Sequence, residues 1–106
     1  MAFNIKLLAQ GQLGTTKAAL YTVPASTQAI IKAITLVNTN TAAVTVNLYV
    51  TRGTASRRII PQNLNLGVGY LLETDLPYTL EAGDIIEGDA SVGAVVDYTI
   101  HGVEEV

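Results

Sequence analysis

Two neighbouring runs of β-forming residues, at positions 29–38 and 44–51, constrain the fold of this chain more than any other feature. The first run has apolar residues on both alternating faces, with Ile31 opposite Ile34, which is typical of a strand covered on both sides. The second run alternates cleanly, with Val46 and Leu48 on one face and polar residues on the other. Asn and Thr residues at 38–41 supply turn chemistry between the runs. The sequence therefore predicts two long strands joined by a polar turn.

Short strand-like segments, separated by Gly, Pro, Asn and Ser turns, fill the rest of the sequence. No window of about 11 residues has apolar residues at helical spacing, so helix should be nearly absent. The length of 106 residues suits one domain. We expect an all-β fold, a jelly-roll β-sandwich of about eight antiparallel strands over residues 18–106. Residues 1–17 should form an N-terminal arm or an extra strand, followed by a flexible connector that begins at Gln10.

The charges are segregated along the chain, because all six Lys and Arg residues precede residue 73 and all nine Asp and Glu residues follow residue 72. A jelly roll is one long hairpin rolled up, so its early strands pair with its late strands in reverse order. A fold-back at residues 61–63 would place basic segments beside acidic ones. The predicted pairs of segments are 18–23 with 94–103, 29–38 with 84–89, and 44–51 with 77–80.

This pairing predicts specific contacts between opposite charges. They are Lys17 with Glu104, Lys32 with Glu87, and Arg52 with Glu81. An immunoglobulin-like sandwich is the alternative, although the Cys and Trp residues usual in that fold are missing from the sequence.

The surface of the folded chain should be short of charge. Charged residues make up 14% of the sequence, against roughly 25% in ordinary soluble domains, and hydrophobic residues make up 49%. Burial of part of this surface against other chains explains the composition, so we expect a stable homo-oligomer held by apolar contacts. The candidate interface residues are Phe3, Ile5, Leu7, Tyr49, Arg57 and Arg58.

Composition argues against several classes of protein. The sequence has no cysteine, so a disulfide framework and a thiolate metal site are both ruled out. Six cations spread over 72 residues make a poor surface for binding phosphates, so we expect no nucleic acid partner. No apolar run approaches the roughly 18 residues of a membrane span, and the first residues lack a signal-peptide core. We therefore expect a soluble protein that is made in the cytoplasm and has no membrane partner.

Residues that could carry chemistry are few. His101 is the sole histidine and no nucleophile-elbow motif accompanies it, so we expect no catalytic residues and no enzyme activity. Four acidic residues could offer oxygen ligands to Ca²⁺, namely Asp84, Glu87, Asp89 and Asp97, but they lack calcium-loop spacing and a solvated acidic edge is the simpler interpretation. We expect no metal and no cofactor. The five tyrosines could instead form a patch that stacks on sugars, which keeps glycan binding as an alternative.

Four segments of the sequence resemble small β-sandwich structural proteins of tailed bacteriophages. They read Leu-Tyr-Thr-Val-Pro-Ala at 20–25, Ile-Thr-Leu-Val-Asn-Thr at 34–39, Val-Thr-Val-Asn-Leu-Tyr-Val at 44–50 and Leu-Glu-Ala-Gly-Asp-Ile-Ile at 80–86. The resemblance covers residues 18–103 and leaves the first 17 residues outside it.

The resemblance implies a non-enzymatic virion component, such as a head decoration or cement protein or a head or tail accessory. Its partners would be the major capsid or tail protein and further copies of itself. A trimer is favoured, because jelly-roll decoration proteins of this kind often occupy three-fold positions of capsids, and the N-terminal segment could be an arm that docks on a neighbour. The alternative on the same particle is a receptor- or glycan-binding module.

Overall fold

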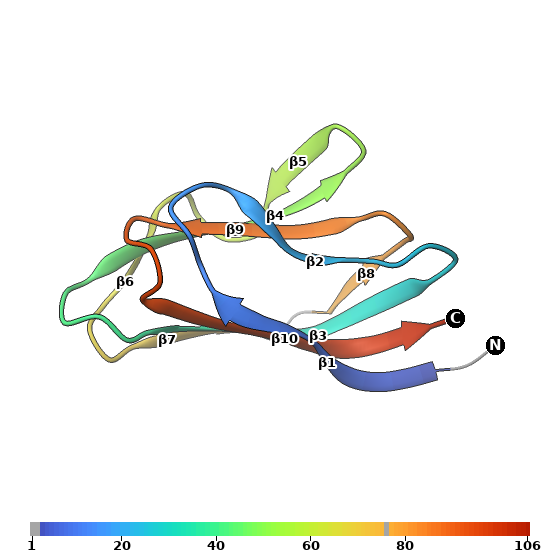
Figure 1. Ribbon diagram of the computed structural model, residues 1–106, viewed down its shortest axis with the longest axis horizontal. Coiled ribbons are helices and arrows are strands. Elements are labelled where there is room, and N and C mark those ends of the chain that lie inside the picture. The colour runs from blue at the N-terminus through green and yellow to red at the C-terminus, as the bar shows by residue number, and fades with distance from the viewer. Residues whose placement is uncertain (1–2, 76) are drawn as a thin grey trace.

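Two antiparallel β-sheets lie face to face in the computed structural model, which describes residues 3–75 and 77–106 (Figure 1). These residues form ten strands and no helix. The predicted all-β sandwich is therefore confirmed, with more strands than expected.

The first sheet, called sheet A, has the strand order β1-β10-β3-β7, and β8 pairs with the other end of β3. All of its neighbouring strands are antiparallel. One edge of sheet A is therefore the long strand β1, and the other edge is divided between β7 and β8. The strands are β1 (Phe3–Gln12), β3 (Gln28–Asn38), β7 (Leu71–Thr74), β8 (Tyr78–Leu80) and β10 (Val96–Glu105).

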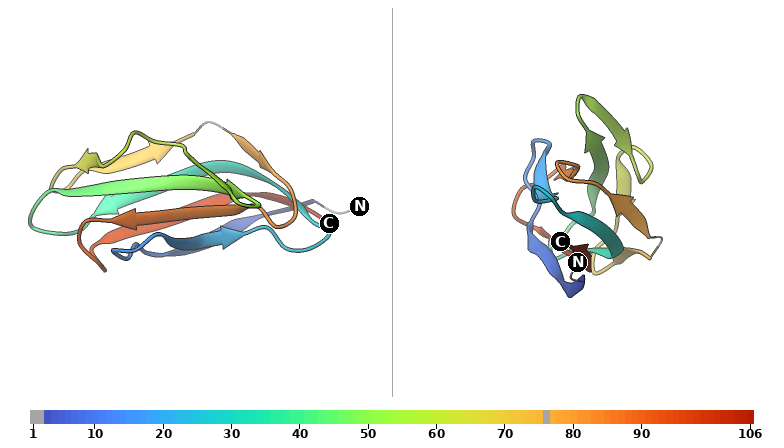
Figure 2. Two further views of the ribbon diagram at one scale, coloured as in Figure 1. Left: turned by 90° about the horizontal axis from the view of Figure 1, so that it is seen from above. Right: turned by 90° about the vertical axis from the view of Figure 1, so that its right-hand side faces the viewer.

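The second sheet, called sheet B, has the order β2-β9-β4-β5, and β6 pairs with the other end of β4. One edge of sheet B is therefore β2, and the other is divided between β5 and β6. The strands are β2 (Ala18–Thr22), β4 (Val44–Arg52), β5 (Ala55–Arg58), β6 (Leu64–Leu66) and β9 (Ile85–Ala90). Both views in Figure 2 place β1 and β2 on one side of the sandwich.

The strands pair in reverse order, but the partners predicted for each segment are wrong. The chain folds back at Gly53, where φ is +60°, and not at residues 61–63, so β4 pairs with β5 and β6. From that turn outwards, β3 pairs with β7 and β8, β2 pairs with β9, and β1 pairs with β10. The prediction failed because it misplaced the turn and did not count the N-terminal segment as the first strand of the roll.

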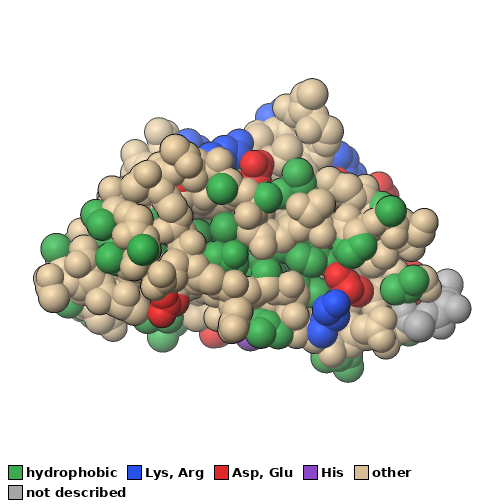
Figure 3. Space-filling view, viewed as in Figure 1, with side chains coloured by type: hydrophobic (Ala, Val, Ile, Leu, Met, Phe, Trp, Pro, Cys, Tyr) green, Lys and Arg blue, Asp and Glu red, His purple; other side chains and the backbone are tan. Residues whose placement is uncertain are grey.

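The hydrophobic core lies between the sheets and takes alternate residues from their long strands. Burial of Val44, Val46 and Leu48 confirms the core face predicted for the second run. The expected flexible connector is instead fixed, because Leu13 is 1% exposed and its N–H donates to the carbonyl of Val96 at 2.9 Å. Figure 3 looks at the side of the sandwich where β1 and β2 lie, and hydrophobic side chains form a band between the two sheets there.

Two β-bulges lie at one level of sheet A, on either side of β10. One is in β1 between Leu7 and Ala9, and the other is in β3 opposite the step from His101 to Gly102. The bulge in β3 interrupts the strict alternation, so Ile31 shares the core face with Ile34, contrary to the sequence interpretation.

Gly102 is required at the bulge in β3. A Cβ atom at this position would lie 2.0 Å from the carbonyl oxygen of Ile30, which is well inside van der Waals contact. The two backbones can therefore approach this closely only because residue 102 has no side chain.

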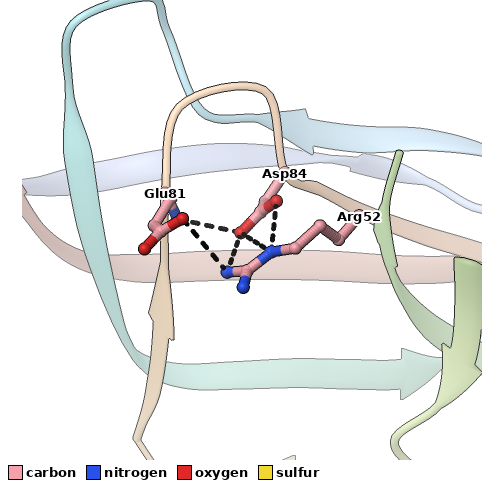
Figure 4. A network of polar contacts seen from close by, with 3 residues as sticks. All are labelled: Arg52, Glu81 and Asp84. Atoms are coloured by element: carbon pink, nitrogen blue, oxygen red, sulfur yellow. Dashed lines mark hydrogen bonds and ion pairs between the residues drawn. The ribbon is translucent and has the colours of Figure 1, made fainter.

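One of the three predicted charge contacts is confirmed. Arg52 Nη2 lies 3.9 Å from Glu81 Oε2, and it also lies 2.6 Å from Asp84 Oδ2, which the sequence analysis did not assign to it (Figure 4). Asp84 is buried, and its carboxylate also accepts a hydrogen bond from the backbone N–H of Glu81. The hydrogen bonds from Arg52 hold the pKa of Asp84 below its usual range.

The other two predicted charge contacts are wrong. Lys17 lies 3.8 Å from Glu87, and the partner of Glu104 is Lys6 at 3.0 Å. Lys32 and Glu87 lie on different sheets, because β3 belongs to sheet A and β9 to sheet B. Each error follows from the misassigned strand partners.

Candidate interaction surface

The side of sheet A that points away from the core carries an exposed apolar row at its β1 edge. On β1, Phe3, Ile5 and Leu7 are 66%, 89% and 48% exposed. The register continues this apolar row across the sheet, because Ile5 lies opposite Val103, and Val103 lies opposite Ile30. We call the outward side of this sheet the outer face of sheet A. Its apolar residues are Phe3, Ile5, Leu7, Ile30, Ala33, Val37, Leu71 and Val103, and its polar and charged residues include Gln10, Gln12, Lys32, Thr35, Glu73, Asp97, Thr99, His101 and Glu105.

A shallow depression lies on the outer face of sheet A where the two bulges meet β10. Its lining is largely apolar, with the side chains of Lys32 and His101 at its rim among those of β1 and β10. Because Lys32 is the extra residue of the β3 bulge, the same irregularity that fixes Gly102 also places this cation on the outer face. The depression is lined by Ile5, Lys6, Leu7, Lys32, His101, Gly102 and Val103.

The outer face of sheet B is polar and its groups bind one another. Asn47 is 6% exposed and lies at the centre of the network. Its Nδ2 donates to Asp89 Oδ1 at 2.8 Å and to Asn63 Oδ1 at 3.0 Å, and its Oδ1 accepts from Arg58 Nη1 at 2.6 Å. Asn47 Oδ1 also accepts from the backbone N–H of Asn63, so the whole amide is satisfied.

Tyr49 belongs to the same network. Its hydroxyl donates to Asp89 Oδ2 at 3.0 Å, and burial together with this carboxylate raises the pKa of Tyr49. The cations of Lys17 and Arg58 lie over its ring, at 4.3 Å and 5.0 Å from the centroid. Tyr49 and Arg58 therefore contact residues of their own chain.

The predicted interface residues fall into two groups on opposite sheets. Phe3, Ile5 and Leu7 lie together on β1 of sheet A, whereas Tyr49, Arg57 and Arg58 lie on β4 and β5 of sheet B. Arg57 is exposed, and its Nη1 donates to the carbonyl of Ser56. The structure thus brings the first three residues together in an apolar surface and does not join the other three to it.

Sequence reasoning missed several residues of the outer face of sheet A. Ile30 is exposed, although the pattern of its strand predicts cover on both faces. Leu71 follows a glycine-containing turn, in which Tyr70 N–H donates to the carbonyl of Gly67, and the sequence does not show which way its side chain points. Val103 was a detectable signal, because it alternates with His101 and Thr99 on the outward side of the last strand.

The buried carboxylate of Glu104 in sheet A binds one residue of the edge strand β1 and one residue of sheet B. Glu104 of β10 is 6% exposed and accepts hydrogen bonds from the hydroxyl of Tyr21 on β2 at 2.5 Å and from Lys6 on β1 at 3.0 Å. These contacts, led by that of Tyr21, hold the pKa of Glu104 below its usual range, and burial beside Glu104 raises the pKa of Tyr21. The contacts of Lys6 and Tyr21 fix the edge strand and join the two sheets.

The acidic residues considered as calcium ligands have other contacts. Asp84 pairs with Arg52, Asp89 with Asn47 and Tyr49, and Asp97 of β10 accepts from Gln12 on the neighbouring strand β1. Within residues 3–75 and 77–106, no three His, Asp or Glu side chains are grouped as metal ligands.

The tyrosines are dispersed and form no stacking patch. Tyr21 is buried in the core, Tyr49 lies on sheet B, and Tyr70 is 69% exposed in the turn between β6 and β7. Tyr98 lies on sheet A beside Gly11. These tyrosines therefore do not gather on one surface, and glycan binding stays an untested alternative.

Among the residues that the structure describes, no helix combines the length and hydropathy needed to cross a membrane.

The comparisons with protein families and with curated proteins found no relative of this chain. No protein-family model matches this sequence, and no curated protein matches it at a significant level.

Proposed function

We propose that this chain is a non-enzymatic structural protein of a bacteriophage particle, which decorates or stabilises the capsid or tail through subunit contacts. The observation that carries the proposal is the β1 part of the outer face of sheet A, where Phe3, Ile5 and Leu7 lie side by side and are 66%, 89% and 48% exposed. Soluble monomers rarely leave large apolar side chains together on one flat surface, and contiguous apolar patches usually mark interaction sites. The four segments at 20–25, 34–39, 44–50 and 80–86 support the choice of a virion component.

The order of strand pairing supports a jelly-roll topology. Reverse-order pairing from the turn at Gly53 is what one long hairpin rolled into a sandwich produces. Jelly-roll domains occur in viral capsids as well as in other proteins. The topology is thus consistent with the proposed role but does not by itself select it.

The two sheets suit different surroundings in an assembled particle. The outer face of sheet A fits against the major capsid or tail protein and against further copies of this chain. The outer face of sheet B fits toward solvent, because its polar groups already bind one another. The low charge content supports self-association, and the resemblance favours three copies.

The proposal is tested on purified particles of the phage that encodes the chain. Mass spectrometry should find the chain in many copies per particle, and electron microscopy should place it at repeated positions on the head or tail. Particles that lack the chain would overturn the proposal.

A matched pair of variants assigns the binding surface. Leu71→Lys places a charge on the outer face of sheet A and should sharply reduce incorporation into particles. Asn65→Lys places the same charge on an exposed position of β6 in sheet B, opposite Thr45, and it should leave incorporation unchanged. Equal incorporation of both variants would contradict a role for the outer face of sheet A.

A further inference from the structure

We infer that the edge strand β1 is a pairing site for a second copy of this chain. The β1 strands of two copies run antiparallel about a two-fold axis near Ile5, and they join two A sheets into one continuous sheet. This inference rests on the proposed function and names one partner within it. A strand edge can take such a partner because its unpaired backbone N–H and C=O groups form a template for another strand.

Three of the four edge positions in the sandwich carry features that discourage strand pairing. The β7–β8 edge is interrupted between Thr74 and Tyr78, with Pro77 beside the gap. The β5–β6 edge carries Arg57 and Arg58 and is followed by Pro61. Short strands, charges and proline are the usual means by which proteins protect an edge. The β2 edge has five residues and is followed by Pro24.

β1 has fewer of these features. It runs for ten residues without proline, and Lys6 is its sole charged residue. Its bulge lies between Leu7 and Ala9 and leaves the stretch 3–7 regular. The Lys6 ammonium lies 3.0 Å from the buried carboxylate of Glu104, so it does not stand free along the edge. A long, apolar edge without a free charge is the kind that pairs with another strand.

The apolar residues of β1 are self-complementary under a two-fold axis. In an antiparallel pair centred on Ile5, the Ile5 side chains of the two copies are neighbours, and Phe3 of each copy lies opposite Leu7 of the other. All three residues point to the same outer face, so the outer faces of the two A sheets become continuous.

Apolar side chains lie exposed on the side of the molecule that carries β1. Figures 1 and 3 view this side, where they form a band between the two sheets. Partly buried apolar residues beside β1 and β2 add to the contact, namely Leu8, Ala9 and Leu20.

Charge on this side does not oppose a second copy. Lys6 pairs with Glu104, and Lys17 lies 3.8 Å from Glu87, so the cations beside the β1 and β2 edges already have partners within the chain. A capsid or tail protein could also occupy the edge, and the experiment below separates that outcome from pairing between copies.

Single-cysteine variants test the inference directly, because the chain has no cysteine of its own. Ile5→Cys would place two thiols across the two-fold axis, where the Cα atoms of an antiparallel pair lie about 4.5–5.5 Å apart, a separation that a disulfide spans. Leu71→Cys is the matched control, since it is also exposed on the outer face of sheet A but lies at the opposite edge. Both purified variants are oxidised with diamide at micromolar concentration and separated on a non-reducing gel.

The inference predicts that Ile5→Cys forms a disulfide-linked dimer roughly 10³-fold faster than Leu71→Cys, because pairing raises the effective thiol concentration from micromolar to millimolar or above. Equal cross-linking of both variants would show face-to-face packing and overturn the strand pairing. No cross-linking at Ile5 would overturn it too, since the β1 edges of two copies would then not meet.

The number of copies separates this inference from the proposed function. Pairing about a two-fold axis gives two copies, or six when combined with a three-fold ring. A trimer without a cross-link at Ile5 would overturn the strand pairing and leave the proposed function standing. If the chain were absent from particles but formed the cross-linked dimer, the proposed function would be overturned and the strand pairing would stand.

Discussion

The outer faces of sheets A and B differ in chemistry, although each sheet has five strands and the two sheets share one core. On sheet B, Asn47, Tyr49, Asp89 and Arg58 bind one another. On sheet A, Phe3, Ile5 and Leu71 are exposed apolar side chains. Strand alternation therefore gives both sheets a similar inner face and leaves the outer faces free to differ.

The difference separates stability from binding. Hydrogen bonds on sheet B are satisfied within the chain, so they stabilise the single chain and offer few unpaired groups to a partner. Exposed apolar residues on sheet A gain little by folding of the single chain, because they remain in water. Substitutions on sheet B should thus change the free energy of unfolding, and substitutions on sheet A should change association.

The largest expected effect breaks sheet A itself. Gly102→Ala should lower the free energy of unfolding by about 3 kcal/mol or more, since the added Cβ meets a backbone oxygen and the β3 bulge cannot relax without losing its register. Gly88→Ala at the matching central strand of sheet B should cost about 1–2 kcal/mol, because the added Cβ would lie 3.0 Å from the side chain of Leu20 and 3.1 Å from the backbone oxygen of Asn47, a much smaller overlap than at Gly102. Urea unfolding followed by circular dichroism measures both values, and equal losses would refute the role of the bulge.

Glu104 joins the two sheets, so its removal should weaken both. Glu104→Gln should lower the free energy of unfolding by about 2 kcal/mol at neutral pH, because Lys6 and Tyr21 lose a charged acceptor. The folded pKa of Glu104 lies below its unfolded value of about 4.3. Its contribution is therefore present above that pH and is lost as the pH falls through the folded pKa.

The pH dependence gives this prediction a second measurement. Urea unfolding from pH 7 to pH 2 should show a smaller loss of stability in Glu104→Gln than in the unmodified chain. Asp84→Asn is the control, since Asp84 also has a lowered pKa and should remove a separate part of the acid-dependent loss. Identical pH profiles for the unmodified chain and Glu104→Gln would contradict the assignment.

The network on sheet B should matter for stability alone. Asn47→Ala should lower the free energy of unfolding by about 1–2 kcal/mol, because Asp89, Arg58 and Asn63 lose hydrogen-bond partners. Sedimentation should show the same number of copies per assembly as in the unmodified chain. A variant that keeps its stability but dissociates would reverse the comparison between the two faces.

The smallest effect on stability is expected on sheet A. Ile5→Thr keeps β propensity at an exposed position, so the free energy of unfolding of the single chain should change by no more than about 0.5 kcal/mol. Association should nevertheless weaken, because the central apolar residue of the proposed pairing edge is lost. Unfolding measured at a concentration where the chain is monomeric, together with sedimentation at higher concentration, checks both parts.

Alternation in the sequence was sufficient to predict the class of fold and part of the core. The pattern of Val44, Val46 and Leu48 predicted a half-buried strand, and the structure has that strand. Alternation could not predict the bulge at Lys32, because an extra residue in a strand depends on the close approach of Gly102 and Ile30 from distant parts of the chain. For the same reason, alternation placed Ile31 on the wrong face of its strand.

Strand partners were harder to predict than strands. Both Gly53 and residues 61–63 have turn chemistry, and the choice between them decides every pair in the roll. The charge pattern favoured the wrong turn. Once β1 is counted as the first strand, Glu104 pairs with Lys6, and Lys17 pairs with Glu87. Among the candidate interface residues, Phe3, Ile5 and Leu7 could be chosen from apolar alternation in the sequence. Placing Leu71 on the same face requires knowledge of the register of β7 on β3.

Sedimentation of the purified, unmodified chain at micromolar concentration in roughly 0.5 M salt tests the central claim most directly. Salt at this level screens exposed ion pairs within a few ångströms, but it leaves an apolar interface intact. The account predicts an oligomer whose size does not fall when salt is added. A single species of 11.2 kDa under these conditions would contradict the claim that sheet A binds other chains of this protein.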